Sequence, residues 1–427
     1  MPIPPIPEAL RREVEKFVES NFDFAFKPEK PAVRLHECTF GADEINAALA
    51  TMLSTYVTMG DQTRHFEALC SRHFGFQHGI MVNSGSSANL LAVAALTNPA
   101  SGPLLRAGDE VIVPALSWST TVWPLIQCGL VPVIIDIDPT TLNLDLNQAR
   151  QAIGPKTRGI MPVHVYGNPC DMDGLMELAD SHNLVVIEDC CEALGALYRG
   201  RSVGSFGVVG TFSFYYSHHI TTLEGGICHT NDFDLAEVMR ILRAHGWVRE
   251  TQNREIYEKQ HAEIDPRFLF VNVGYNLRPT ELQASFGPIQ LRKLEKFIEV
   301  RADNAGFWRE AMRPLEKFFR FQEPTPNGRH SWFGFPMVIQ PGAPVNPREF
   351  RDFLKQNQIE NRPLIAGNIA RQPALKLFPH RIFGDLKESD LVMSNGFTFG
   401  NHQAVDEAAR NYVLDTIIKF FKQKRLI

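Results

Sequence analysis

Short apolar runs alternate with segments of helical periodicity between residues 79 and 187. Each run is bounded by Gly, Pro, Asn or Asp, which is typical of a strand buried on both faces. The runs cover residues 79–82, 110–115, 131–137, 159–165 and 184–187, and the helical patterns between them cover residues 87–97, 120–127, 145–153 and 172–182. This alternation predicts an α/β protein with a mainly parallel sheet.

The flanking segments predict helices at the start of the chain and a second unit at its end. Helical patterns cover residues 8–22, 43–56, 62–73, 232–245 and 279–307. A polar stretch at 249–265 predicts a loop or lid. A strand pattern at 332–339 and helical patterns at 346–356 and 406–424 predict a smaller α+β unit.

Length and composition fit a chain of two domains. Its 427 residues exceed the size at which a single core stops growing. We therefore expect an N-terminal extension at 1–34, a large cofactor-binding domain at 35–290 and a small C-terminal domain at 291–427. The net charge of −5 comes without a basic run, which argues against nucleic-acid binding. No apolar run reaches the length of a membrane span, so we expect a cytoplasmic protein.

The seven cysteines are scattered, apart from the adjacent pair Cys190 and Cys191. No C-x-x-C spacing occurs, so the sequence predicts neither a zinc site nor a disulfide framework. Reduced thiols in the cytosol fit this pattern best.

A strand–turn–strand segment at 211–230 carries two neighbouring histidines, His218 and His219. The apolar strand that begins at Thr211 leads into a polar turn, a Glu224-Gly-Gly break and a second short strand. Adjacent side chains on an extended turn diverge, so at most one of the pair faces a given site. On this segment alone, exposed surface residues and a functional role are equally good interpretations.

Polar groups follow several of the predicted strands, where ligands bind in open α/β sheets. The Gly/Ser turn at 83–90 opens a helix and presents backbone N–H groups suited to a phosphate, although a plain serine N-cap explains it as well. Asp189 fits the ring nitrogen of a cofactor or, alternatively, a helix N-cap. Trp118 fits a ring stacker or an ordinary core residue.

Taken together, these strand ends predict more than each of them does alone. With the polar group Tyr166-Gly-Asn168, they offer a phosphate cradle, a ring stacker and a carboxylate. That combination predicts a site for an aromatic, phosphorylated cofactor that contains nitrogen. Pyridoxal phosphate fits, with the carboxylate as partner to its ring nitrogen.

Five segments together carry a resemblance that covers residues 35 to 425. They are Asn83-Ser-Gly-Ser-Ser-Ala88, Pro162-Val-His-Val-Tyr-Gly167, Ile187-Glu-Asp-Cys-Cys-Glu-Ala-Leu-Gly195, residues 213–226, and Gly274-Tyr-Asn-Leu-Arg-Pro-Thr-Glu-Leu-Gln-Ala284. They resemble the sugar aminotransferase family often named DegT/DnrJ/StrS. The resemblance implies the type I pyridoxal-phosphate fold of aspartate aminotransferase, with a smaller C-terminal α+β domain.

The resemblance also implies how the cofactor is held. Asp189 pairs with the pyridine nitrogen, Trp118 stacks on the ring, and Glu192 stands where the family has Gln or an acidic residue near the ring hydroxyl. Asn276 reaches the phosphate in a neighbouring subunit, which implies a homodimer with shared active sites. The cofactor-binding residues implied in this way are Gly85, Ser86, Trp118, Asp189, Glu192, Ser213 and Asn276.

One position departs from the usual family pattern. Most members have a lysine that bonds covalently to the cofactor, and counting five residues on from Ser213 gives His218 instead. No lysine lies between Arg201 and Glu258 to replace it. Imidazole forms no stable bond of this kind, so we expect non-covalently bound pyridoxal or pyridoxamine phosphate. A histidine pKa near neutrality suits His218 as a general base. Leu223 also departs, because the family usually has Gly there.

A small branch of the family, the hexulose 3-dehydratases, shares the Lys-to-His change. The segments 332–336 and 362–373 also resemble this branch, whose members act on 4-keto-6-deoxy sugars carried on CDP or GDP. The resemblance implies that the C3 hydroxyl leaves as water, with His218 as the base. It also implies a place in deoxysugar and lipopolysaccharide O-antigen biosynthesis.

The branch completes its cycle either by transamination from glutamate or through an iron–sulfur cluster and a reductase. No cysteine follows Cys228, and Cys190 and Cys191 cannot complete a four-cysteine cluster, so we expect glutamate. Three alternatives stay open: a sugar-nucleotide aminotransferase, an iron–sulfur-partnered CDP-sugar 3-dehydrase, and a catalytically silent binding protein. Candidate substrate contacts, for which solvated surface is the competing interpretation, are His219, Arg249, Arg254 and Arg362.

Overall fold

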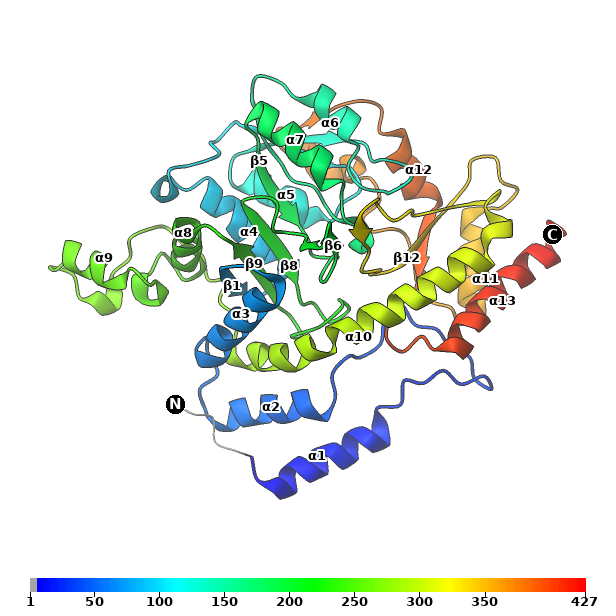
Figure 1. Cartoon of the computed structure of the whole chain (residues 1–427), viewed down its shortest axis with the longest axis horizontal. Coiled ribbons are helices and arrows are strands. Elements are labelled where there is room, and N and C mark those ends of the chain that lie inside the picture. The colour runs from blue at the N-terminus through cyan, green and yellow to red at the C-terminus, as the bar shows by residue number, and fades with distance from the viewer. Residues whose placement is uncertain (1–5) are drawn as a thin grey trace.

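The computed structural model describes residues 6–427 and is built on a central sheet of eight strands (Figure 1). From one edge to the other these are β1 (His78–Val82), β9 (Gly226–Thr230), β8 (Val209–Ser213), β5 (Val185–Asp189), β4 (Thr157–Ile160), β2 (Glu110–Pro114), β3 (Val131–Ile135) and β14 (Arg381–Ile382). β9 runs antiparallel to both neighbours, and the remaining pairs are parallel. The predicted mainly parallel α/β sheet is confirmed.

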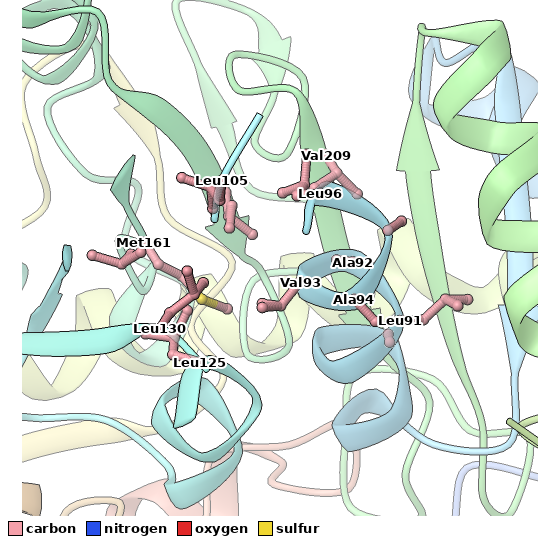
Figure 2. Close-up of a cluster of buried hydrophobic side chains, with 14 of the residues drawn as sticks. Leu91, Ala92, Val93, Ala94, Leu96, Leu105, Leu125, Leu130, Met161 and Val209 are labelled. Carbon is pink, nitrogen blue, oxygen red and sulfur yellow. The ribbon is translucent and has the colours of Figure 1, made fainter. Parts of the chain in front are cut away.

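Helices between the strands cover the sheet. They are α4 (Gly85–Leu96), α5 (Ser119–Gln127), α6 (Leu146–Ala152), α7 (Met172–His182) and α8 (Phe233–Arg243). α4 is the innermost of them, with nine of its twelve residues buried. Its Leu91 and Val93 belong to the same core cluster as Leu125, Leu130 and Met161 (Figure 2). The nearly all-apolar sequence of α4 follows from this central place.

The 31-residue helix α10 (Glu281–Ala311) runs from beneath the central sheet to a second, smaller sheet (Figure 1). α2 (Ala42–Leu53) and α3 (Asp61–Phe74) pack on its first half, and α1 (Glu8–Asn21) lies outside α2. Gly287 lets α10 approach α3 closely, because a Cβ there would lie 2.3 Å from the ring of Phe66.

The smaller sheet has an aromatic core. Its antiparallel strands are, in order, β10 (Phe319–Phe321), β12 (Phe335–Ile339), β15 (Gly396–Phe399) and β13 (Asn361–Arg362). It packs with α11 (Pro347–Gln356), α12 (Lys387–Asn395) and α13 (Glu407–Gln423). Trp308 of α10, Phe335 and Phe399 stack within this core. Three short strands, β6 (Leu197–Tyr198), β7 (Arg201–Ser202) and β11 (Gly328–Arg329), form a third sheet.

Three elements differ from those predicted. The strand expected at 159–165 ends at Ile160, and the chain then forms a 3-10 turn at Val165–Gly167 in which Tyr166 has φ 56°. The polar stretch expected to be a loop contains α9 (Arg254–Gln260). β14 comes from the C-terminal third of the chain and yet pairs with β3 of the central sheet.

The proposed domain boundaries stay a prediction. The expected boundary at 290 falls inside α10, which serves both parts. At the other boundary, Val33 of the expected N-terminal extension pairs with Ile359 beside the smaller sheet. None of the helices within residues 6–427 combines the length and apolar character that crossing a membrane requires.

Candidate active site

A cavity of about 340 Å³ opens at the carboxyl ends of β5 and β8. It lies between the central sheet and residues of the smaller part, such as Phe333, which precedes β12, and Arg362 of β13. The predicted site residues that line it are Gly85, Ser86, Trp118, Asp189, Glu192, Ser213, His218 and Arg362. Residues from across the sequence thus meet in one cavity, as the strand-end argument predicts.

The first turn of α4 forms one wall. The Ser84 hydroxyl caps the helix by accepting from the Ser87 N–H at 3.1 Å, as an N-cap serine does. Gly85 lies directly against the end of β8, where a Cβ would come within 2.5 Å of Ser213 Cβ. The exposed Ser86 hydroxyl lies 3.1 Å from that of Thr120. Backbone N–H groups, hydroxyls and a helix N-terminus therefore converge, which is the chemistry that holds a phosphate.

Asp189 forms the floor of the cavity at the end of β5 and is 4% exposed. Its Oδ2 accepts from Asn89 Nδ2 at 2.9 Å and from Thr121 Oγ1 at 2.8 Å. Its Oδ1 accepts from the Cys191 N–H at 3.1 Å. A carboxylate fixed in this way suits a protonated ring nitrogen.

A buried cluster behind Asp189 holds the backbone of β5. Glu188 accepts from three backbone N–H groups, those of Gly204, Phe206 and Gly207, each at 2.7 Å. His164 Nδ1 accepts from a backbone N–H, so its Nε2–H donates to Glu188 at 3.1 Å. In residues 6–427 these two, with Cys190, are the only close group of three potential metal ligands. Hydrogen bonds already occupy the carboxylate, so the cluster is structural.

His218 sits in the turn between β8 and β9, which its own N–H tightens by donating to Tyr215 O at 2.9 Å. Its ring lies 5.0 Å from that of Phe333, and Nδ1 is buried without a hydrogen-bond partner. Burial, and then the charge of Arg362, lower the pKa of His218 to about 3. The expected pKa near neutrality is therefore wrong for the protein without ligands, and the imidazole is neutral throughout the physiological range.

Glu192 also lines the cavity. Its Oε2 accepts from the Tyr166 N–H at 2.9 Å. Burial raises the pKa of Glu192 to about 7, against the lowering effect of that hydrogen bond. The side chain is therefore partly protonated at neutral pH and then donates, as the glutamine of other family members does.

Four predicted residues lie outside the cavity lining. His219 is fully buried and its Nε2–H donates to Ser331 O at 2.9 Å, so it supports the turn instead of contacting a substrate. Arg249 stacks over Trp247, and Arg254 pairs with Glu258 on α9. Both arginines belong to the segment that stands away from the body of the molecule (Figure 1). Asn276 is exposed and accepts from Arg278 Nε.

Several lining residues were missed in the sequence. Phe333 packs against His218, and Asn89 and Thr121 orient Asp189. Asn89 carried a usable signal, because it is a polar residue that follows the serines of the first turn in a largely apolar helix. Nothing in the sequence pattern places Phe333 against His218, since they come from loops far apart in the sequence.

The side chains present fit pyridoxal phosphate. The hydroxyls and backbone N–H groups of Gly85, Ser86 and Ser213 suit its phosphate, and the fixed Asp189 carboxylate suits its ring nitrogen. Trp118, with 57% of its surface exposed at the cavity edge, offers a flat face to the ring. No lysine lines the described cavity.

Comparison with known proteins supports this assignment. Residues 39–418 match the DegT/DnrJ/EryC1/StrS aminotransferase family. The chain is 38% identical over 372 residues to GDP-4-keto-6-deoxy-D-mannose 3-dehydratase of Yersinia pseudotuberculosis, which covers 86% of this chain and 94% of that protein. It is 35% identical over 431 residues to lipopolysaccharide biosynthesis protein RfbH of Salmonella typhimurium, which covers 96% of this chain and 98% of that one.

A solved structure of GDP-4-keto-6-deoxymannose-3-dehydratase with a trapped PLP-glutamate geminal diamine superposes with a TM-score of 0.84. It is 34% identical and covers 90% of this chain and 100% of that chain. The type I fold, the pyridoxal phosphate dependence and the resemblance to the 3-dehydratase branch are confirmed. The match spans most of the chain, and the chain therefore belongs to the DegT/DnrJ/EryC1/StrS aminotransferase family of pyridoxal-phosphate enzymes.

Proposed function

We propose that this protein removes the C3 hydroxyl of a nucleotide-linked 4-keto-6-deoxy sugar, with GDP as the favoured nucleotide. The observation that carries the proposal is the position of His218. Its imidazole borders a cavity built for pyridoxal phosphate, in the turn where other members of the family have their lysine. A base without the ability to bond covalently suits elimination better than an ordinary amination cycle.

Bound cofactor would supply an amine for the sugar ketone and a ring that accepts electrons. The chain would supply the remaining chemistry. Gly85, Ser86 and Ser213 would hold the phosphate, and Asp189 would keep the ring nitrogen protonated. Trp118 would cover one face of the ring.

His218 moves the proton. Its Nδ1 is enclosed, which leaves Nε2 as the nitrogen on the cavity side. In the neutral tautomer that carries its proton on Nδ1, the lone pair of Nε2 is free to accept a proton. Negative charge from the cofactor phosphate and the sugar nucleotide raises the pKa of His218 in the complex and strengthens it as a base. Phe333 and Tyr215 flank the ring and limit its rotation.

Glutamate is the proposed amino donor, and a homodimer is the proposed active unit. Asn276 is exposed and far in sequence from the cavity residues, which fits a residue that serves the partner's site. Arg249 and Arg254 are assigned to nucleotide-sugar contacts across the same interface. A cytoplasmic location accords with seven unpaired cysteines.

The product of the reaction tests the function. Purified protein is incubated with pyridoxamine phosphate, glutamate and GDP-, CDP-, dTDP- or UDP-linked 4-keto-6-deoxy sugars, and the products are read by mass. We expect loss of water and retention of a ketone with the GDP sugar. An aminated sugar that keeps its C3 hydroxyl would instead identify an aminotransferase. The cofactor should dialyse away, and borohydride should leave no covalent adduct.

A matched pair of variants tests the base. His218→Asn should lower the dehydration rate by about 10²–10⁴-fold while cofactor binding persists. The control is His219→Asn, the residue that the family usually has there. It retains a donor for Ser331 and should keep most of the activity. Equal losses in both variants would refute the assignment of His218.

A further inference from the structure

A second, small cavity of about 30 Å³ adjoins the cofactor cavity. The two share Ser217, Phe333 and Arg362. The small cavity is also lined by His36 and by Arg301 of α10. His36 lies in residues 33–40, here called the N-terminal strap, which crosses from the smaller sheet to α10. Three segments that are far apart in the sequence thus place an imidazole and two guanidinium groups close to the active-site cavity that His218 lines.

Arg301 is a buried charge without a balancing carboxylate. It is 2% exposed, and its Nη1 donates to the carbonyl oxygens of Phe333 and Asn401. Its Nε is buried and has no hydrogen-bond partner. No carboxylate in residues 6–427 forms an ion pair with this guanidinium. Burial lowers the pKa of Arg301 to about 9, with no opposing charge.

Arg362 and His36 add to this imbalance. Arg362 forms no ion pair with any carboxylate of the described chain either. The His36 ring packs against Tyr216 at 4.2 Å, and its buried Nδ1 has no partner. Burial, followed by the charges of Arg301 and Arg362, lowers the pKa of His36, and the charge of Glu360 opposes this more weakly. The residues that line the cavity include two guanidinium groups and no carboxylate, so the lining favours an anion.

The size of the cavity selects the anion. Since about 10–15 Å³ of such accessible space holds one water molecule, about 30 Å³ has room for the two oxygen atoms of a carboxylate and not for a nucleotide. Guanidinium groups bind carboxylates in a planar, bidentate way, and a buried guanidinium gains most from such a partner. The walls contributed by Leu35, Phe333 and Phe399 suit an aliphatic chain behind the carboxylate.

We propose that this cavity binds a carboxylate of the amino donor, with Arg301, Arg362 and His36 as its receptor. The inference rests on the proposed function for the identity of the donor. The amino donor and the nucleotide sugar must use the active site one after the other. A separate carboxylate subsite explains how both bind, because it lies beside His218 and away from the exposed cavity edge at Trp118. A dicarboxylate is the ligand class expected.

Titration of the pyridoxal-phosphate-loaded protein with glutarate tests the subsite without any nucleotide sugar. The first variant is Arg362→Gln, which removes one guanidinium. The second is His36→Phe, which fills the cavity, keeps an aromatic ring against Tyr216 and introduces no buried charge. We expect each to weaken glutarate binding by at least about tenfold in calorimetry. Arg301→Gln should weaken glutarate binding to the same extent, and thermal unfolding checks that this variant is folded.

Arg309→Gln is the matched control. Arg309 lies on the same helix but pairs with Glu323 away from the cavity, so glutarate binding should stay within about twofold of the wild type. Glutarate binding that is absent in the wild-type protein, or unchanged in Arg362→Gln and His36→Phe, would overturn the proposal. So would equally effective competition by inorganic phosphate, because that result would make the cavity a phosphate site.

Two further amino donors identify which carboxylate of the donor is bound. Their single-turnover reaction is followed by the loss of the visible absorption of the cofactor. L-Glutamine keeps the α-carboxylate, whereas 4-aminobutyrate keeps only the terminal one. If His36→Phe slows the reaction with glutamine, the small cavity binds the α-carboxylate of the donor. If the variant slows the reaction with 4-aminobutyrate, the cavity binds the terminal carboxylate. Insensitivity of both refutes the subsite. These measurements contain no sugar substrate. A protein that binds glutarate but does not dehydrate the sugar would therefore refute the proposed function and not the carboxylate subsite.

Discussion

Burial favours the neutral form of both ionisable side chains that flank the ring site. It raises the pKa of Glu192 to about 7 and lowers the pKa of His218 to about 3. Near pH 6 the lining of the cavity therefore contains a neutral acid and a neutral base. This arrangement leaves the acid able to donate and the base able to accept, before any ligand charge enters.

Glu192→Gln should stabilise the cofactor-free protein above pH 7 by about 1–3 kcal/mol and change it little at pH 5. The folded protein retains a proton that the unfolded chain releases near pH 4.5. The stability that Glu192 contributes is therefore complete below pH 4.5 and is lost as the pH rises through 7. Glutamine resembles the neutral acid and does not titrate. Urea unfolding at pH 5 and pH 8 measures the difference, with the exposed Glu299→Gln as control. An equal effect at both pH values would contradict the pKa assignment.

Leu223 is a second informative position, because it follows the catalytic turn with φ 70°. A non-glycine residue in this region is strained, yet the turn persists, since Leu223 N–H donates to Thr221 Oγ1 at 2.8 Å. Leu223→Gly should raise stability by up to about 1 kcal/mol, against the usual cost of adding a glycine. Thermal unfolding measures the change. Leu377→Gly, at an exposed position without positive φ, should do the opposite, and a matching loss at Leu223 would rule out strain there.

At the scale of elements, a single carboxylate joins α3 to α10. Glu281, in the first turn of α10, accepts from the N–H groups of Gly60, Gln62 and Thr63 at 2.7–2.9 Å and from the Thr63 hydroxyl at 2.8 Å. These include orphan donors at the N-terminus of α3, which a neighbouring helix caps in place of a local side chain. The docking of α3, and with it the floor under the β8–β9 turn, depends on this contact.

Glu281→Gln should therefore lower the free energy of unfolding by about 1–3 kcal/mol, since an amide cannot accept all four hydrogen bonds. Chemical denaturation measures the loss. Glu295→Gln, whose side chain is half-exposed on the same helix, should cost about 0–1 kcal/mol. Similar values for the two variants would mean that the cap has no special weight.

Periodicity predicted elements whose partners are adjacent along the chain. The helices at 172–182 and 346–356, and the strand that follows the first of them, were predicted from local pattern and caps, such as Asn346 before α11. β14 has only two residues and exists because it pairs with β3, about 250 residues earlier, so no local pattern announces it. The extra turn at Tyr166 likewise depends on distant partners, since Phe333 N–H donates to its carbonyl oxygen.

At the scale of the whole molecule, the active site also combines residues that the sequence indicates with residues that depend on distant partners. Asp189 could be proposed because it follows a predicted strand, and Ser213 and His218 could be proposed from the family resemblance. Phe333 could not, because its position depends on how the smaller sheet docks. Arg362 was named only by resemblance. Arg249 and Arg254 were placed with the substrate and do not line this cavity.

The segment that carries these arginines suggests how two chains form one site. Phe268, Phe270 and Val273 are 63%, 51% and 91% exposed beside Asn276, which is a large apolar surface for an isolated chain. If Asn276 serves the partner's cofactor, a mixed dimer of His218→Asn and Asn276→Ala chains contains one site with both defects and one with neither. Each variant alone should be nearly inactive, and random co-assembly should restore about a quarter of the wild-type activity, because half of the dimers are mixed and each has one intact site. Co-expression with two affinity tags isolates the mixed dimers, and because each has one intact site of two, the doubly tagged fraction should show about half of the wild-type activity. If Asn276 instead acts within its own chain, every site in the mixed dimer carries a defect and the doubly tagged fraction stays inactive.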